Sequence, residues 1–72
     1  MQRIDFELDP GRDHVELNQL LKLTGLCDSG GAGKAIVASG DVAVDGTIEL
    51  RKTRKVRVGE VVTIDNVEIH VS

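Results

Sequence analysis

The sequence contains few of the residues that disulfides, metal sites and catalytic centres need. It has one cysteine, Cys27, so no internal disulfide can form. Its two histidines, His14 and His70, stand apart from Cys27 and from each other, without the paired spacing of a zinc site. No serine, histidine and aspartate can be placed together as a catalytic set. The sequence therefore predicts no metal, no cofactor and no enzymatic activity.

Aromatic residues and long apolar runs are also scarce. Phe6 is the one aromatic residue among 72, so the bases of a nucleic acid could not stack on a series of aromatic side chains. No apolar run approaches the length of a membrane span, and residues 1–5 lack the apolar segment of a signal peptide. A chain of this length fits one small domain. We therefore expect a single cytoplasmic domain over residues 1–72.

The charged residues are unevenly distributed along the chain. The net charge is −3, which by itself argues against a nucleic-acid partner. Residues 1–28 carry three basic and six acidic side chains, residues 29–58 six basic and three acidic, and residues 59–72 three acidic and none basic. Five of the nine basic residues lie within positions 51–57. Because salt screens exposed charges beyond about 8 Å, this basic segment can attract a polyanion even on an acidic protein.

The first part of the sequence has the pattern of a strand followed by a helix. Apolar residues alternate over positions 4–8, which predicts a half-buried strand that ends before Pro10. Asp13 and Glu16 have the spacing of a helix N-cap and its capping-box partner. Gly25 stands where a helix C-terminus needs a positive φ. The sequence therefore predicts a first helix that begins at the capping box and ends before Gly25.

A second helix is predicted between Ser29 and Gly40. Serine is a favourable N-cap residue, and a glycine just past the last turn is a common end of a helix. Residues 25–28 leave only a short connection between the two helices. We therefore expect the helices to pack against each other as a corner.

After Gly40 the apolar residues alternate with period two, which is the pattern of strands. The dipeptides Asp45-Gly46 and Asp65-Asn66 predict two-residue hairpin turns, and the second turn would pair Ile64 with Val67. Val56 and Val58 lie in a further short alternating segment. The order of elements predicts an α+β fold with an N-terminal strand, a two-helix corner and then a small, mainly antiparallel sheet.

Residues 29–34 read Ser-Gly-Gly-Ala-Gly-Lys at the start of the second helix. Glycine inside a helix costs up to about 1 kcal/mol relative to alanine, so three of them call for a compensating gain. Either the free N–H groups attract a phosphate beside Lys34, or the glycines let the two helices approach closely. Both interpretations stay open. A nucleotide-binding P-loop is excluded, because Asp28 and Ala35 occupy positions where that motif needs glycine and serine or threonine.

The basic segment at positions 51–57 is the second candidate for a binding site. Arginine contacts a phosphate through two parallel hydrogen bonds, and lysine does so through a compact charge. Such contacts position a nucleic acid without reading its sequence. In the absence of a set of aromatic residues, the segment favours recognition of the backbone and shape of a structured RNA, and stacking of arginine on bases stays open as an alternative. A charge run of this kind is also common on a solvated surface without any ligand.

A set of ordered residues over positions 4–71 resembles a known family. The chain resembles the ribosomal-protein-S-four-type RNA-binding domain, or alpha-L motif, and within it the small stand-alone YbcJ-like group. Two pieces shared with that group are Glu-Leu-Asn-Gln-Leu-Leu-Lys, at positions 16–22, and Ser-Gly-Gly-x-x-Lys, at positions 29–34. Further residues in register with the family are Gly25-Leu26, Ala35-Ile36, Gly40, Val42, Val44-Asp45-Gly46, Val56 and Val58-Gly59-Glu60-Val61-Val62.

The resemblance implies RNA binding through the helix corner and the neighbouring strand loop. Together with the scarcity of aromatic residues, this makes a structured RNA, such as ribosomal or transfer RNA, the expected partner, and we expect the protein to be a monomer. This sequence departs from the family at two positions. Many members have an arginine at the position of Gly30, and many have a basic residue at the position of Glu16. Carried over by position, the RNA-binding residues would be Ser29, Gly30, Gly31, Lys34, Arg51, Lys52, Arg54 and Lys55.

Two other functions remain open at this point. The chain could be a protein-interaction module that uses its acidic ends or an exposed edge strand near residues 67–71. It could also be a subunit that targets a separate enzyme to RNA. The sequence does not decide between these functions and a free RNA-binding protein.

Overall fold

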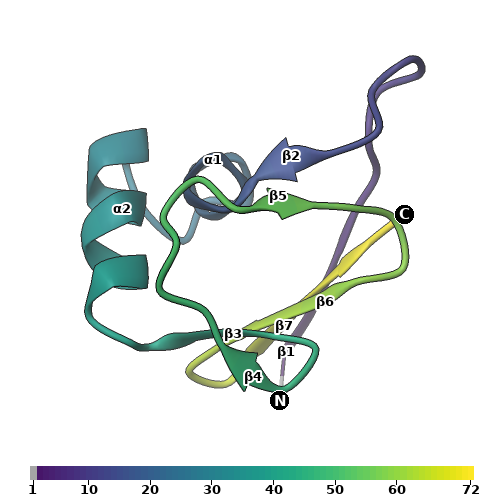
Figure 1. Ribbon diagram of the computed structural model, residues 1–72. Coiled ribbons are helices and arrows are strands. Elements are labelled where there is room, and N and C mark those ends of the chain that lie inside the picture. Colours follow the sequence, from purple (N-terminus) through teal and green to yellow (C-terminus); the bar gives the residue numbers. More distant parts are fainter. Residues whose placement is uncertain (1) are drawn as a thin grey trace.

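The computed structural model describes residues 2–72, and Figure 1 shows two helices packed over one side of a twisted sheet. A second, very short sheet lies beside the first helix. In chain order the elements are β1 (Gln2–Phe6), β2 (Val15–Glu16), α1 (Leu17–Leu23), α2 (Gly30–Ala38), β3 (Val42–Val44), β4 (Thr47–Ile48), β5 (Lys55–Val56), β6 (Val61–Ile64) and β7 (Val67–Val71).

The main sheet has the strand order β1-β7-β6-β3-β4. Strands β3, β4, β6 and β7 pair antiparallel, whereas β1 runs parallel to β7. The predicted α+β fold with a mainly antiparallel sheet is therefore confirmed. The N-terminal strand was expected over residues 4–8 and is found at Gln2–Phe6, while the N–H of Leu8 still donates to the carbonyl of Ser72 at 2.9 Å.

Strand β7 lies inside the sheet, between β1 and β6. The exposed edge strand expected near residues 67–71 is therefore wrong. The alternating pattern of β7 could not show that the first strand of the chain returns to pair with it. The two edges of the main sheet belong to β1 and β4, so β7 cannot accept a strand from a partner protein.

Both predicted hairpin turns are present. The first central residues, Asp45 and Asp65, each have φ of 50°, which is the left-handed conformation that such two-residue turns need. The Asp65-Asn66 turn pairs Ile64 with Val67, as the sequence predicts. Asp45 has an additional contact, because its Oδ1 accepts a hydrogen bond from the N–H of Val61 at 2.9 Å.

The start of the first helix differs from the prediction. Asp13 and Glu16 form no capping box, and α1 begins only at Leu17, without a side-chain cap. Val15 is buried and pairs with Val56, so the segment that was expected to start the helix is a strand, β2, antiparallel to β5. The burial of Val15 therefore decides its conformation over the local capping signal. The carboxylate of Asp13 instead lies 2.6 Å from a ring nitrogen of its neighbour in the chain.

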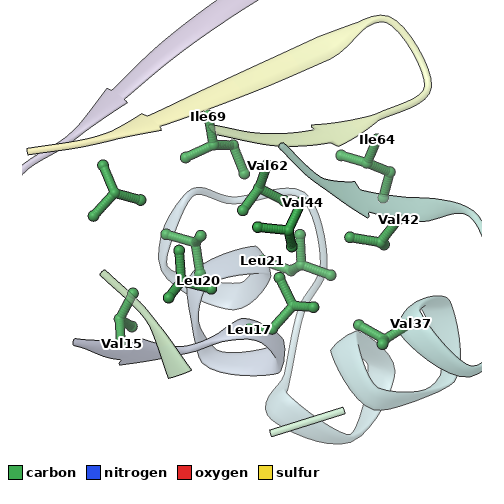
Figure 2. Close-up of a cluster of buried hydrophobic side chains, with 12 residues drawn as sticks. Val15, Leu17, Leu20, Leu21, Val37, Val42, Val44, Val62, Ile64 and Ile69 are labelled. Carbon is green, nitrogen blue, oxygen red and sulfur yellow. The ribbon is translucent and has the colours of Figure 1, made fainter. Parts of the chain in front are cut away.

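The hydrophobic core lies between the helices and the main sheet (Figure 2). Helix α1 supplies three fully buried leucines, and α2 supplies Val37. Of the expected Val56–Val58 alternation only the first residue is buried, and Val58 is 63% exposed. The sheet contributes Val42, Val44, Val62, Ile64, Ile69 and Val71.

Candidate nucleic-acid interface

The start of α2 has two backbone N–H groups without an acceptor among the described residues. Ser29 is the predicted N-cap, and its Oγ accepts a hydrogen bond from the N–H of Ala32 at 3.1 Å. The N–H of Gly33 donates to the carbonyl of Ser29 at 3.0 Å. Within residues 2–72 the N–H groups of Gly30 and Gly31 have no acceptor. Two donors at the positive end of the helix dipole are therefore available to an anion.

The glycines of this segment have different neighbours. A Cβ on Gly33 would lie 2.5 Å from the backbone oxygen of Asn18 in α1, so Gly33 permits the close approach of the two helices. A Cβ on Gly31 would meet only Ser29 Oγ, at 3.8 Å. The packing interpretation therefore holds for Gly33, whereas Gly31 leaves the backbone accessible at the exposed helix start.

The basic loop between β4 and β5 is docked on the start of α1. The carbonyl of Arg54 accepts the N–H of Leu17 at 2.9 Å, and the carbonyl of Lys52 accepts the N–H of Asn18 at 3.1 Å. These bonds supply the helix cap that side chains do not provide. In Figure 1 the green segment after β4 rises from the sheet and crosses beside α1 before it reaches β5. The loop is thus fixed by its main chain.

Asn18 connects the two parts of the predicted RNA surface. Its backbone N–H contacts the loop at Lys52, and its side-chain Nδ2 donates a long hydrogen bond of 3.4 Å to the carbonyl of Gly30. The residue is only 2% exposed. The structure therefore brings the start of α2 and the basic loop to the same corner of the molecule, as the resemblance implied.

Arg54 is held inside an ion-pair network. Its two terminal nitrogens contact Glu60, at 3.2 and 2.8 Å, and its Nε contacts Glu49 at 2.9 Å. One terminal nitrogen also donates to the carbonyl of Lys55 at 3.3 Å. The Arg54 side chain is 23% exposed. Because its guanidinium is bonded to two carboxylates and one carbonyl within the protein, its main contribution is to hold the loop in place.

Arg51 also contacts Glu49, but it lies at the surface. Its Nε and Nη2 reach the two carboxylate oxygens at 3.0 and 2.9 Å, and its backbone N–H donates to Oε2 at 3.0 Å. The Arg51 side chain is 75% exposed, whereas that of Glu49 is 13% exposed. These hydrogen bonds lower the pKa of Glu49 from 4.5 to about 2, and hydrogen bonds from Arg54 lower the pKa of Glu60. Both carboxylates are ionised at neutral pH.

An open depression of about 470 Å³ lies in the surface of the loop. It is lined by Thr53 and by four basic residues, Arg51, Arg54, Lys55 and Arg57. Arg57 was part of the basic segment noted in the sequence, but the resemblance carried over only four of its members. Within residues 2–72, the side chains of Lys52, Lys55, Arg57 and Lys34 form no ion pair.

Residues 2–72 contain no group of three or more histidine, cysteine, aspartate or glutamate side chains that could hold a metal ion. Among the same residues, no helix has the length and apolar character needed to cross a bilayer.

Comparison with known proteins gives the same family from sequence and from structure. The S4 domain family model matches residues 7–72. YbcJ of Escherichia coli (strain K12), provisionally named an RNA-binding protein, is 48% identical over 50 residues, which are 69% of this chain and 71% of that protein. YbcJ of Shigella flexneri has the same identity and coverage. The solution structure of E. coli YbcJ, described as revealing an αL motif involved in RNA binding, matches with a TM-score of 0.70 and 40% identity.

The structural match covers 93% of this chain and 84% of the YbcJ chain. It confirms the expected alpha-L fold and the resemblance to the YbcJ-like group. The relatives are named or described for RNA binding and not for an enzymatic activity. On these matches, this chain belongs to the S4 domain family of RNA-binding proteins.

Proposed function

We propose that this protein binds structured RNA without catalysing a reaction, and that it does so as one domain. The contact surface comprises the start of α2, with Ser29, Gly30, Gly31 and Lys34, and the basic segment at positions 51–57, which runs from the basic loop through β5 to Arg57. The observation that carries this proposal is the open depression lined by four basic side chains. Asn18 hydrogen-bonds to the carbonyls of both Gly30 and Lys52, which supports placing the start of α2 and the basic loop in one binding surface.

The charge balance of this surface favours a polyanion. The segment at positions 51–57 has five basic side chains, and of these Arg51 and Arg54 form ion pairs with the carboxylates of Glu49 and Glu60. Lys34, Lys52 and Lys55 remain exposed and without an ion pair within residues 2–72, as does Arg57. Four phosphate contacts of this kind would give a slope of log affinity against log salt of about −3 to −4.

The lack of aromatic residues favours RNA with a folded backbone. Phe6, the one aromatic side chain, lies on β1 and packs against the core, so it offers no platform for a base. Recognition therefore depends on the positions of the phosphates, which a folded RNA holds fixed and a flexible strand does not. Ribosomal and transfer RNA are folded RNAs of this type.

The test compares folded and flexible RNA on the same protein. Binding of a labelled RNA hairpin and of an unpaired strand of equal length is measured at several salt concentrations, and cross-linking in cells identifies the natural RNA. The proposal expects tighter binding of the hairpin and a cross-linked folded RNA. Absence of binding by the folded protein would refute it. Salt-insensitive capture of one protein, without any RNA cross-link, would instead support the protein-interaction function.

A further inference from the structure

The two arginines that share Glu49 differ in how freely they can exchange their partner. Arg54 is 23% exposed and is held by two carboxylates and one carbonyl. Arg51 is 75% exposed, and among the residues described its side chain contacts only Glu49. Both side chains line the same depression. Only Arg51 can therefore leave its carboxylate without taking apart the loop.

We propose that Glu49 is an internal competitor for phosphate, and that RNA binding transfers the Arg51 guanidinium from Glu49 to an RNA phosphate. This inference rests on the proposed function, because it requires RNA in the depression. Glu49 would then be a residue that determines RNA selectivity. A phosphate that reaches Arg51 must replace two hydrogen bonds that the carboxylate already makes.

The geometry of the network makes this exchange feasible. A carboxylate and a phosphate accept the same pair of parallel hydrogen bonds from a guanidinium, so the bond type is conserved. After Arg51 leaves, Glu49 keeps its contact with Arg54 Nε at 2.9 Å and with the backbone N–H of Arg51 at 3.0 Å. The carboxylate is therefore not left as an unpaired charge, which would be costly for a side chain that is only 13% exposed.

The competition has a consequence for selectivity. In a flexible strand, each phosphate has to displace the carboxylate largely alone, because the neighbouring phosphates are not held in positions where they bind at the same time. A folded RNA presents several phosphates at once. Its contacts to Lys55 and Arg57 in the same depression contribute binding free energy that offsets the cost of displacing Glu49 from Arg51. Glu49 therefore lowers affinity for flexible polyanions more than affinity for an RNA that fits the surface.

The test removes the competing charge and compares it with a matched control. Glu49→Gln and Glu60→Gln each remove one negative charge from the same network, but only Glu49 contacts Arg51. Affinities for a 20-nucleotide poly(U) strand and for an RNA hairpin are measured for both variants. We expect Glu49→Gln to bind poly(U) about three- to fivefold more tightly than Glu60→Gln does, with a smaller gain for the hairpin. In the presence of Arg51→Ala this difference should disappear.

A second measurement needs no variant and is therefore independent of any effect on folding. In NMR spectra of the wild-type protein, the Arg51 Nε–H signal should shift on addition of the hairpin, while the Arg54 Nε–H signal stays in place. Equal affinities of the two glutamine variants for poly(U), or an Arg51 signal that does not move while RNA is bound, would overturn the inference. Failure of the folded wild-type protein to bind either RNA would overturn the proposed function itself.

Discussion

At the scale of single residues, the glycines at the start of α2 show how one sequence pattern can serve two purposes. Gly33 lies where a side chain would meet the backbone of α1, and Gly31 lies where a side chain would meet almost nothing. Backbone cannot move aside as a flexible side chain can. The cost of replacing each glycine should therefore differ, although the two are only two positions apart.

Replacement of Gly33 by alanine should destabilise the protein. The added Cβ would lie 2.5 Å from the Asn18 carbonyl oxygen, so the helices must separate, at a cost of about 1–3 kcal/mol in the free energy of unfolding. The control is Gly31→Ala, whose Cβ makes an ordinary contact at 3.8 Å and which should change stability by less than about 1 kcal/mol. Urea unfolding measures both. Equal stability of the two variants would contradict the close approach of α1 and α2 at Gly33.

Gly30 offers a test in the direction of stronger binding. A Cβ at this position would lie 2.8 Å from Gln19 Nε2, the far end of a flexible side chain that can move, and 3.3 Å from Nδ2 of the buried Asn18. Gly30→Arg adds a cation beside the free N–H groups of α2, and an arginine at this position is common in the family. We expect higher affinity for the RNA hairpin and a salt slope steeper by about 0.7–0.9, whereas the uncharged control Gly30→Met should leave the slope unchanged. A Gly30→Arg variant with the wild-type slope would place the RNA elsewhere.

At the scale of elements, the loop between β4 and β5 owes its position to main-chain bonds on α1 and to the network around Arg54. Glu49 and Glu60 have pKa values below their ordinary range because arginines donate hydrogen bonds to them. A carboxylate with a lowered pKa in the folded state stabilises the protein fully above its ordinary pKa. That contribution is lost as the pH falls towards the pKa of the folded state.

The melting temperature should therefore fall as the pH is lowered from about 4.5 towards 2, which is the range set by Glu49. At pH 7, Glu49→Gln should melt at a lower temperature than the wild-type protein. On acidification its melting temperature should fall by less than that of the wild-type protein. Glu7→Gln, which changes an exposed acid outside the network, should follow the wild-type curve. Thermal melts at a series of pH values measure this. Parallel curves for Glu49→Gln and wild type would contradict the role given to the network.

The two hairpin turns provide a second prediction at this scale. Asp45 and Asp65 have the same φ of 50°, but only Asp45 accepts a hydrogen bond, from the N–H of Val61, among the residues described. Asp45→Ala should therefore reduce the free energy of unfolding by about 1 kcal/mol more than Asp65→Ala does. Asp45→Asn keeps an acceptor and should recover most of this difference. Equal losses for the two alanine variants would mean that the bond to Val61 adds no stability.

The sequence predicts the local features of these elements and misses the distant ones. Turns such as Asp45-Gly46 and the Ser29 cap depend on neighbouring residues, so their signals are complete within a few positions. The start of α1 depends on the pairing of Val15 with Val56, forty-one positions away, and this overrides the capping pattern at Asp13. The interior place of β7 depends likewise on β1, from the other end of the chain.

At the scale of the whole molecule, an acidic protein presents a basic surface at one corner. The sequence locates this surface through the cluster of basic residues, but it does not show which of them are already neutralised. Arg54 and Glu60 are six positions apart and meet only because the loop folds back. In the proposed function, the basic side chains left to contact RNA are Lys34, Lys52, Lys55 and Arg57, and Arg51 is proposed to leave Glu49 when RNA binds.

The salt dependence of RNA affinity tests this account most directly. The triple variant Lys52→Ala, Lys55→Ala, Arg57→Ala removes three charges from the proposed surface. Its matched control, Arg3→Ala, Arg12→Ala, Lys22→Ala, removes three positive charges elsewhere in the chain. For the RNA hairpin, the slope should become shallower than the wild-type slope by about 2 to 3 in the first variant and stay near the wild-type value in the second. Equal slopes in the two triple variants would contradict the assignment of the RNA-binding surface.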